Sequence, residues 1–257
     1  MNPSAVGART LLVAGFLASL GAGAHAEVIY HNDFETSSGI GSEWNHHDRS
    51  TGALSGFLGR FGDIPVILTL GLPDDQPGDD PGDPGDPGDP GDPITKPISE
   101  LPMIGGGDGG VAARAGDSVW VYSITFDAYF IDSWDGADDA FGQDFFFAKI
   151  NGTKLFQEFF DNHDADDNYR APDDGPRNMG WADWEDSVYR NIRIDFLVAD
   201  GVTDLEFRWR GTADQGIEDE SWGLDNVTLS RQLVPVPSPA SALPIGLLAL
   251  GIRRRRA

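Results

Sequence analysis

The chain contains no cysteine among its 257 residues. Disulfide bonds, thiolate metal sites and cysteine nucleophiles are therefore excluded. Basic residues are also scarce, since 18 lysines and arginines stand against 42 aspartates and glutamates, for a net charge of −24. Nucleic-acid binding needs Lys and Arg to displace counterions, so this balance argues against a nucleic-acid partner. Divalent cations are the expected partners of so acidic a chain.

Long apolar runs occur only at the two ends of the chain. Residues 1–26 have a basic residue at Arg9, an apolar run over 11–20 and small residues at Ala24 and Ala26. This layout is typical of a secretory signal peptide, with cleavage expected before Glu27. The alternative, a buried N-terminal helix, lacks the polar face that would make the helix amphipathic.

The other end, residues 234–257, joins a proline-rich motif, a 13-residue apolar stretch and four consecutive arginines. A helix needs roughly 20 apolar residues to span a bilayer, so the stretch is short. The arginines would hold their end on the cytoplasmic side. These parts favour a temporary anchor that is cut, although an ordinary C-terminal membrane anchor is the alternative.

The order of these parts resembles the PEP-CTERM sorting tail, which exosortases recognise in Gram-negative bacteria that export polysaccharide. Two positions depart from that pattern: Val236 replaces the usual glutamate, and Pro244 interrupts the apolar segment. The resemblance implies an exosortase partner, transient inner-membrane association, and a final place at the cell surface, outer envelope or extracellular matrix. The sorting motif would comprise Val234, Pro235, Pro237, Arg253, Arg254, Arg255 and Arg256.

Loss of both ends would make the remaining protein more acidic. Arg9 and the four terminal arginines account for five of the 18 basic residues, and every acidic residue lies at or after Glu27. The remainder has 42 acidic and 13 basic residues, a net charge of −29. Such a charge repels the compact state unless cations screen it.

A low-complexity segment divides the middle of the chain. Residues 74–92 are almost entirely Asp, Pro and Gly, and a glycine-rich run follows at 105–110. Prolines remove backbone donors, like charges repel, and no apolar side chain offsets the entropy of ordering. We therefore expect a disordered insertion over 74–116 within a domain that spans 27–231, followed by the tail at 232–257.

The rest of the sequence predicts strands and no long helix. Residues 119–131 are rich in β-branched and aromatic side chains, and Trp120, Tyr122, Ile124, Phe126, Ala128 and Phe130 share one face at period two. Asn151-Gly152 predicts a tight hairpin, because both residues tolerate positive φ. We expect an all-β fold, an antiparallel β-sandwich or jelly roll. Its strands are predicted at 28–34, 64–70, 119–131, 145–150, 154–160, 188–198, 205–209 and 222–229.

In such sandwiches the first and last strands often lie side by side, which would bring Asp33-Phe34-Glu35 close to residues 222–226. This pair of motifs resembles those of lectin-like jelly rolls, including MAM-type and carbohydrate-binding-module domains, which sometimes hold a structural calcium. The segments IDSWDG at 131–136 and DESWGLDNV at 219–227 also resemble exported PEP-CTERM proteins.

Calcium is the expected cofactor, because Ca²⁺ takes six to eight hard oxygen ligands and acidic clusters are dense here. None of the clusters matches the EF-hand pattern, and each could instead be a solvated acidic loop. The first candidate cluster is Asp33, Glu35, Asp219 and Asp225, with Glu220 or Asn226 as helpers. The second is Asp132, Asp135, Asp138 and Asp139, and the third is Asp161, Asp164, Asp166 and Asp167.

Sugar binding is the second hypothesis. Four tryptophans lie beside acidic residues in turn-like contexts, where an indole could stack on a sugar while carboxylates bind its hydroxyls. These are Trp134, Trp181, Trp184 and Trp222. The alternative places Trp120, Trp209 and Trp222 in the core and makes Trp184 a loop anchor, because aromatic side chains dominate cores.

Enzymatic signatures are weak. The spacing of Glu218, Asp219 and Glu220 does not provide the paired carboxylates of jelly-roll glycoside hydrolases, and His46-His47 lacks supporting metal-ligand spacing. No serine-hydrolase elbow, phosphate loop or dinucleotide fingerprint occurs. We therefore expect an exported, non-enzymatic, calcium-stabilised β-sandwich that binds polysaccharide. The alternatives are a secreted glycan-active hydrolase and a purely structural biofilm matrix protein.

Overall fold

The computed structural model describes residues 26–51, 55–73, 94, 96–105, 117–137, 142–163, 168–181, 183–213 and 215–236. The predicted signal peptide, the Pro-Gly-Asp repeat and the tail from residue 237 onward lie outside these ranges. The predictions made for those segments therefore stay predictions.

Within the described residues the chain forms strands and two short 3₁₀ turns. No helix in these ranges has the length and apolar character needed to cross a membrane. The elements are β1 (Glu27–Asn32), η1 (Ser37–Gly39), β2 (Arg49–Thr51), β3 (Gly56–Phe61), β4 (Val66–Gly71), η2 (Ile98–Glu100), β5 (Met103–Ile104), β6 (Ser118–Asp132), β7 (Phe145–Ile150), β8 (Thr153–Phe159), β9 (Asp174–Arg177), β10 (Asp186–Val198), β11 (Asp204–Gly211) and β12 (Glu220–Pro235).

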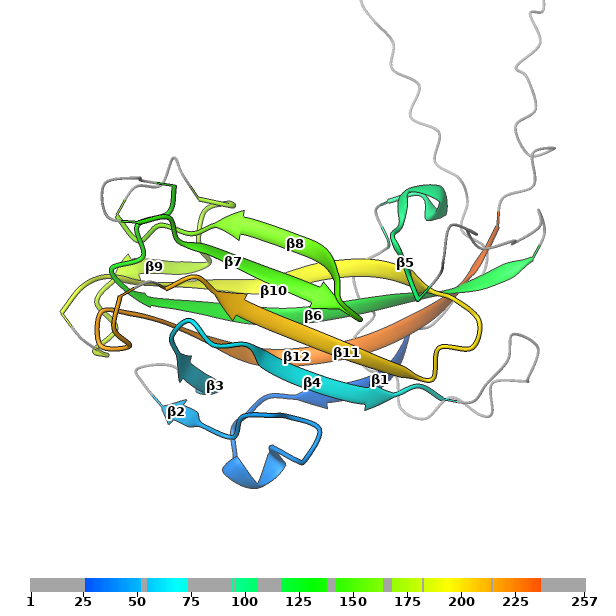
Figure 1. Cartoon of the computed structure of the whole chain (residues 1–257), viewed down its shortest axis with the longest axis horizontal. Helices are drawn as coiled ribbons and strands as arrows, with labels where there is room; N and C mark the ends of the chain where they lie inside the picture. The colour runs from blue at the N-terminus through cyan, green and yellow to red at the C-terminus, as the bar shows by residue number, and fades with distance from the viewer. Residues whose placement is uncertain are drawn as a thin grey trace, which may run out of the picture.

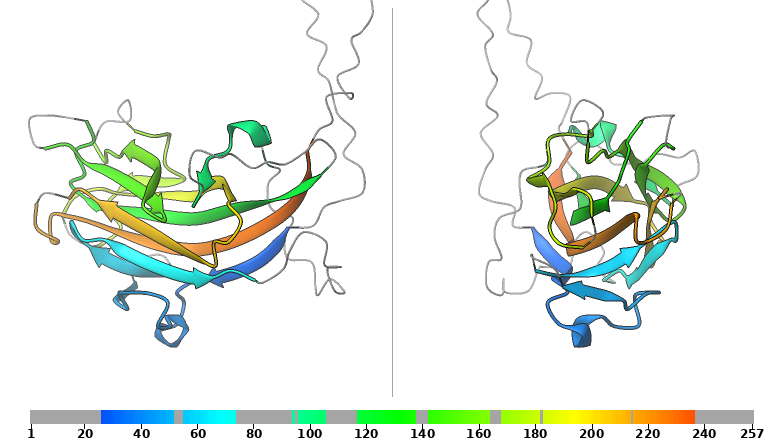
Figure 2. Two further views of the ribbon diagram at one scale, coloured as in Figure 1. Left: turned by 45° about the vertical axis from the view of Figure 1, so that its right-hand side comes forward. Right: turned by 90° about the vertical axis from the view of Figure 1, so that its left-hand side faces the viewer.

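The strands form two sheets, and the predicted all-β sandwich is confirmed (Figure 1). The larger sheet has the order β2-β3-β12-β6-β10-β5, with β1 also paired to β12 and β9 to β10; the smaller has the order β4-β11-β7-β8. Pairing is antiparallel except between β5 and β10. The long strands β6 and β12 bend along their length (Figure 2).

The first and last strands pair as predicted, with Asn32 opposite Val227 in the β1–β12 ladder. The strand β3 pairs with residues 222–224 of the same strand β12. The hairpin between β7 and β8 also forms as predicted, because Asn151 and Gly152 have φ values of 45° and 80°.

The core lies between the two sheets and is unusually aromatic. Alternate residues of β6, including Phe126 and Phe130, pack against side chains of the smaller sheet. Trp44 stacks on Trp209 with ring centroids 5.8 Å apart, and Phe130 stacks on Phe160 at 3.8 Å. Burial of these large apolar surfaces is the main stabilising contribution to the fold.

A β-bulge changes which residues of β10 face the core. Strict period-two alternation along the strand predicted at 188–198 would point Val188 inward with Ile192, but the register shifts between Tyr189 and Ile192, and Asn191 has φ 54°. Tyr189 therefore faces the main core, whereas Val188 packs in a separate apolar cluster with Tyr129. An extra residue in a strand reverses the alternation beyond it, so the simple period-two pattern was wrong here.

Four strands have no clear signal in the sequence: β2, β3, β5 and β9. One of them, β5, lies inside the segment 74–116 that we expected to be disordered. Leu101 and Ile104 are buried, and Ile104 belongs to the main core. The apolar side chains within residues 94–104 offset the entropy cost of ordering this segment.

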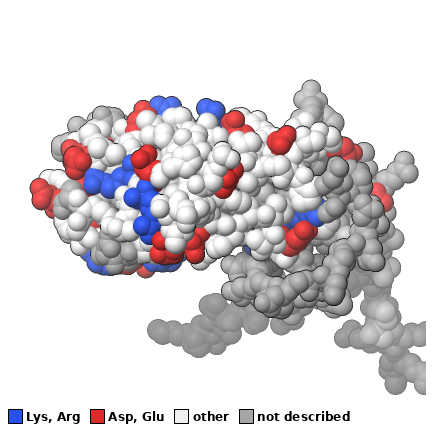
Figure 3. Space-filling view, turned by 90° about the horizontal axis from the view of Figure 1, so that it is seen from below, with Lys and Arg blue, Asp and Glu red and all other residues white. Residues whose placement is uncertain are grey.

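Charge is unevenly distributed over the surface. In the view from below, Lys and Arg side chains gather toward the end of the molecule where β2 and β3 lie, with Asp and Glu side chains beside them (Figure 3). Much of the rest of that face carries no charged side chain.

Candidate functional site

Three carboxylates from three separate segments converge at one end of the sandwich. Asp135 follows β6, Asp144 directly precedes β7, and Glu220 is the first residue of β12. Each offers an oxygen that lies within 4.8 Å of the other two. Asp144 and Glu220 are each 1% exposed, and Asp135 is half-buried. We refer to these three residues as the acidic triad.

Local hydrogen bonds hold the triad in place. The backbone N–H of Asp135 donates to Asp144 Oδ2 at 2.8 Å, and the backbone N–H of Asp144 donates to the carbonyl of Gly136 at 2.7 Å. The turn before β12 folds back onto Glu220, because the backbone N–H and side-chain amide of Gln215 donate to its two carboxylate oxygens at 3.1 and 2.7 Å. The triad geometry is thus fixed by the surrounding loops.

The buried triad could hold a metal ion. Calcium lies about 2.3–2.6 Å from its oxygen ligands, so two ligands on one ion can be separated by up to about 5 Å. The triad satisfies this limit. Three carboxylates supply between three and six oxygens, and main-chain carbonyls or water would complete the shell. Like charges at such low exposure repel one another, and a divalent cation relieves that repulsion.

An imidazole and an indole extend from the triad toward solvent. His163 Nε2 lies 4.0 Å from Asp135 Oδ1, and the His163 ring packs edge-on against Trp184 with centroids 5.8 Å apart. Trp184 is 55% exposed, while its backbone N–H donates to Asp132 Oδ1 at 2.8 Å. The exposed indole is therefore anchored through its main chain at the same end of the sandwich as the triad.

The structure separates the first predicted metal cluster into different surroundings. Asp33 Oδ1 accepts the backbone N–H of Glu35, and both residues are exposed. Asp219 Oδ1 accepts the hydroxyl of Ser133 at 2.8 Å. Asp219 is six residues before Asp225 along an extended strand, a distance of about 20 Å. These carboxylates cannot share one ion.

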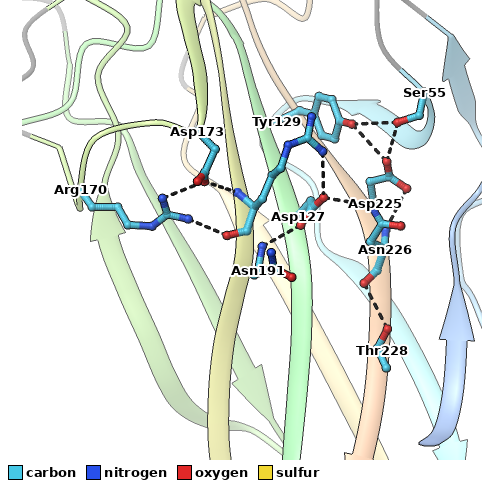
Figure 4. Close-up of polar contacts among 10 residues, drawn as sticks. Ser55, Asp127, Tyr129, Arg170, Asp173, Asn191, Asp225, Asn226 and Thr228 are labelled. Atoms are coloured by element: carbon cyan, nitrogen blue, oxygen red, sulfur yellow. Dashed lines mark hydrogen bonds and ion pairs between the residues drawn. The ribbon is translucent and has the colours of Figure 1, made fainter. Parts of the chain in front are cut away.

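Two further members of that cluster, Asp225 and Asn226, belong to a polar network on the outer face of the larger sheet (Figure 4). Asp225 Oδ2 accepts the hydroxyls of Ser55 and Tyr129 at 2.9 and 3.1 Å. Asn226 Nδ2 donates to Asp127 Oδ2 at 2.9 Å. Only the helper Glu220 from the first predicted group enters the triad.

Asp127 lies at the centre of this outer-face network. Its Oδ1 accepts the backbone N–H of Asn191 at 2.7 Å, and its Oδ2 faces Arg190 Nη1 at 3.4 Å as well as Asn226. Asn191 and Asn226 both have positive φ, at the bulges of β10 and β12. One carboxylate thus joins the two bulged strands that flank β6 (Figure 4).

Burial raises the pKa of Asp225 to about 6, although the hydrogen bonds from Ser55, Tyr129 and the Asn226 backbone lower it in part. Burial also raises the pKa values of Asp132 and Asp186. These two carboxyls adjoin one another, since Asp186 Oδ1 accepts the backbone N–H of Asp132 at 3.0 Å. The large sheet thus buries three carboxyl groups that bind protons more tightly than usual.

The other predicted clusters contribute in part. From the second, Asp135 joins the triad, Asp132 does not, and Asp138 and Asp139 lie outside the described residues. From the third, Asp161 is buried. Its Oδ1 accepts the backbone N–H of His163 at 2.5 Å, and its backbone carbonyl accepts Nδ2 of Asn168 at 2.6 Å. The remaining members, Asp164, Asp166 and Asp167, lie outside the described residues.

Sequence reasoning missed Asp144 as a ligand candidate. It stands alone between Gln143 and the aromatic strand β7, so no local cluster of acids marks it. The one sequence feature that could have identified it is its position directly before a buried strand, because a carboxylate there lies in a loop at the end of the sandwich.

Two of the four tryptophans proposed as sugar platforms are corrected by the structure. Trp134 and Trp222 are fully buried, and their indole N–H groups donate to the carbonyls of Ser221 and Gly62. Neither offers a ring face to a ligand, because the core already covers them. Trp181 is half-buried against Phe57, which leaves Trp184 as the exposed platform.

The first residues of the predicted sorting motif belong to the sheet. Val234 and Pro235 end β12, where they lie opposite Val119 and Ser118 of β6. Pro237 and Arg253 to Arg256 lie outside the described residues.

The sequence matches no protein-family model and no curated protein. Among solved structures, it is similar to dimeric latent PorU from Porphyromonas gingivalis, at 10% sequence identity and a TM-score of 0.39. The match covers 86% of this chain and 14% of the PorU chain, so this chain spans a small part of that protein's length. This likeness is too distant to bear on function.

Proposed function

We propose that this protein is an exported, non-enzymatic cell-surface or matrix module whose β-sandwich is stabilised by one calcium ion and binds polysaccharide. The observation that carries the proposal is the acidic triad, in which Asp135, Asp144 and Glu220 converge within 4.8 Å. An ion there would join the loop after β6, the start of β7 and the start of β12. Export and sorting by an exosortase rest on the two ends of the sequence.

Calcium binding is tested by melting the full chain in chelator and in millimolar calcium. A ligand that binds only the folded state at about 100 times its Kd stabilises it by about 2.7 kcal/mol. For a domain of this size that corresponds to a rise in Tm of about 5–10 °C. Glu220→Gln should remove the rise, and Glu218→Gln, whose side chain is 85% exposed, should keep it. An unchanged Tm in the parent protein would remove calcium from the proposal.

Polysaccharide binding is supported by Trp184, since its half-exposed indole offers an apolar face beside acidic groups. Retention of the full chain on the host's exopolysaccharide should fall at least tenfold in Trp184→Ala, with Tm unchanged. New reducing ends in the polysaccharide would instead favour the glycan-active hydrolase. Equal retention of parent and variant would remove Trp184 from the binding surface.

A further inference from the structure

An open groove of about 540 Å³ lies at the edge of the larger sheet, where the core residue Phe61 forms part of its lining. It runs between the β2–β3 hairpin and the turn that precedes β12. Its walls include Arg49, Arg60, Asp48, Glu218, Ile64 and Ile217. The volume falls in the range of small-ligand sites, about 300–1,000 Å³.

The two arginines of the groove differ from the others in the described chain. Arg49 donates to the backbone carbonyls of Phe34 and Glu35, and its nearest carboxylate oxygen is 3.9 Å away. Arg60 donates to the hydroxyl of Ser221 and the carbonyl of Ile217, with Glu218 also at 3.9 Å. The remaining described arginines each meet a carboxylate at 3.4 Å or less.

This difference leaves the two guanidinium groups without a close ion pair, while the carboxylates of Asp48 and Glu218 lie in the same walls. Backbone carbonyls orient a guanidinium without neutralising it, and Glu218 is 85% exposed, so its pairing with Arg60 is weak. Asp132 and Asp186 are near enough for Arg60 to lower their pKa values, but burial raises both above the ordinary value. In the view from below, basic side chains gather at this end of the molecule (Figure 3).

The walls of the groove also contain apolar side chains and hydrogen-bond acceptors. Ile64 and Ile217 are 40% and 44% exposed, which is uncommon for isoleucine in a folded protein. Asp48 and Glu218 provide acceptors for hydroxyl groups. Fixed guanidinium groups bind carboxylates in paired hydrogen bonds, apolar walls take the C–H face of a ring, and acceptors bind hydroxyls.

A sugar ring that bears a carboxylate has a partner for each of these three features: its carboxylate, its C–H face and its hydroxyl groups. We infer that the groove between β2–β3 and the turn before β12 binds a uronic-acid residue of an acidic polysaccharide. This inference rests on the polysaccharide-binding part of the proposed function and gives it a second site and a ligand class. Arg49 and Arg60 take the carboxylate, while Ile64 and Ile217 contact the ring.

The test uses the full chain in chelator, titrated with a β-1,4-linked glucuronic-acid oligosaccharide and with the neutral glucose oligosaccharide of the same linkage and length. We expect the acidic oligosaccharide to bind at least tenfold more tightly, with affinity that falls as salt rises. Arg60→Gln should weaken binding at least tenfold, and Arg177→Gln, which removes an exposed arginine paired with Asp174, should not.

Arg60 also supports the turn, so a second pair of variants separates binding from folding. Ile217→Glu and Ile217→Lys place opposite charges at one exposed position of the groove. The Lys variant should bind the acidic oligosaccharide at least threefold more tightly than the parent, and the Glu variant at least threefold more weakly. Equal affinities of the two variants would overturn the assignment.

The remaining outcomes separate this inference from the proposed function. Preference for a poly-glutamate peptide over the uronate would make the groove a peptide site and overturn the inference. Polysaccharide binding that depends on Trp184 but ignores the charges at position 217 would overturn the groove and leave the proposed function intact. Uronate binding without any calcium-dependent rise in Tm would support the groove and contradict the calcium proposal.

Discussion

Gln215 and Glu220 are joined by two hydrogen bonds at the start of the last strand. The backbone N–H and the side-chain amide of Gln215 donate to the two carboxylate oxygens of Glu220 at 3.1 and 2.7 Å. The pair fixes the turn between them, which carries Ile217 on the wall of the groove. The acidic triad and the groove therefore share one structural element, although they bind chemically different ligands in our proposals.

The first prediction concerns this pair. In Gln215→Ala, Glu220 loses a hydrogen bond that orients its carboxylate. Partners of metal ligands typically contribute 10- to 100-fold to metal affinity, so we expect the calcium Kd to rise at least tenfold. Isothermal titration of the full chain with calcium measures this. Gln157→Ala, an exposed amide on β8, is the matched control, and an equal Kd in both variants would contradict the prediction.

The second prediction is a pH dependence that belongs to Asp225. Its folded pKa of about 6 lies above the ordinary value of 3.8. The folded state therefore binds this proton more tightly, and the resulting stabilisation is complete below pH 4 and lost as pH rises through 6. About two pKa units correspond to roughly 3 kcal/mol in the free energy of unfolding.

Asp225→Asn removes this titration. Urea unfolding at pH 4, 5, 6 and 7 should show that the parent protein loses up to about 3 kcal/mol relative to the variant across this range. Asp132 and Asp186 titrate in both proteins, so the difference between the two profiles isolates Asp225. Asp200→Asn, in an exposed turn, should follow the parent. Parallel profiles for the parent and Asp225→Asn would refute the assignment.

The third prediction tests the central carboxylate of the outer-face network. Asp127→Ala leaves the backbone N–H of Asn191 and the side-chain amide of Asn226 without their acceptor. Each lost bond to a charged group costs about 1.5–3 kcal/mol, so we expect a loss of about 3–5 kcal/mol in the free energy of unfolding. Glu158→Ala on β8 should change it by less than about 0.5 kcal/mol. A loss below 1 kcal/mol for Asp127→Ala would contradict the prediction and show that the bulges of β10 and β12 are stable without the hydrogen bonds of Asp127.

The fourth prediction concerns the short strand β5. Ile104 is fully buried in the main core, so Ile104→Ala should cost about 2–4 kcal/mol in chemical denaturation. Val28→Ala, at a side chain that is 53% exposed, provides the control and should be nearly neutral. If the two variants are equally stable, β5 does not belong to the cooperative fold.

Local chemistry made much of the fold predictable. The hairpin at Asn151-Gly152 needs only two residues that accept positive φ, and the inward face of β6 needs only an alternating pattern. Val188 was misplaced because a bulge breaks the alternation, and Asn191 carries a signal too weak to locate it. The strands β2 and β3 were missed because β2 has only three residues and no apolar side chain, while Gly59 and Arg60 interrupt the apolar residues of β3. Pairing with neighbouring strands holds both in the sheet.

The sequence by itself determined the all-β class, the pairing of the first and last strands, and an acidity that makes cation binding a reasonable expectation. Only the tertiary structure decided which carboxylates meet. Acids that are neighbours in the sequence, such as Asp132 and Asp135, separate because the chain turns between them, whereas Asp135, Asp144 and Glu220 converge from three segments. The physical reason is that strand patterns depend on near neighbours, whereas convergence of side chains depends on how the two sheets pack.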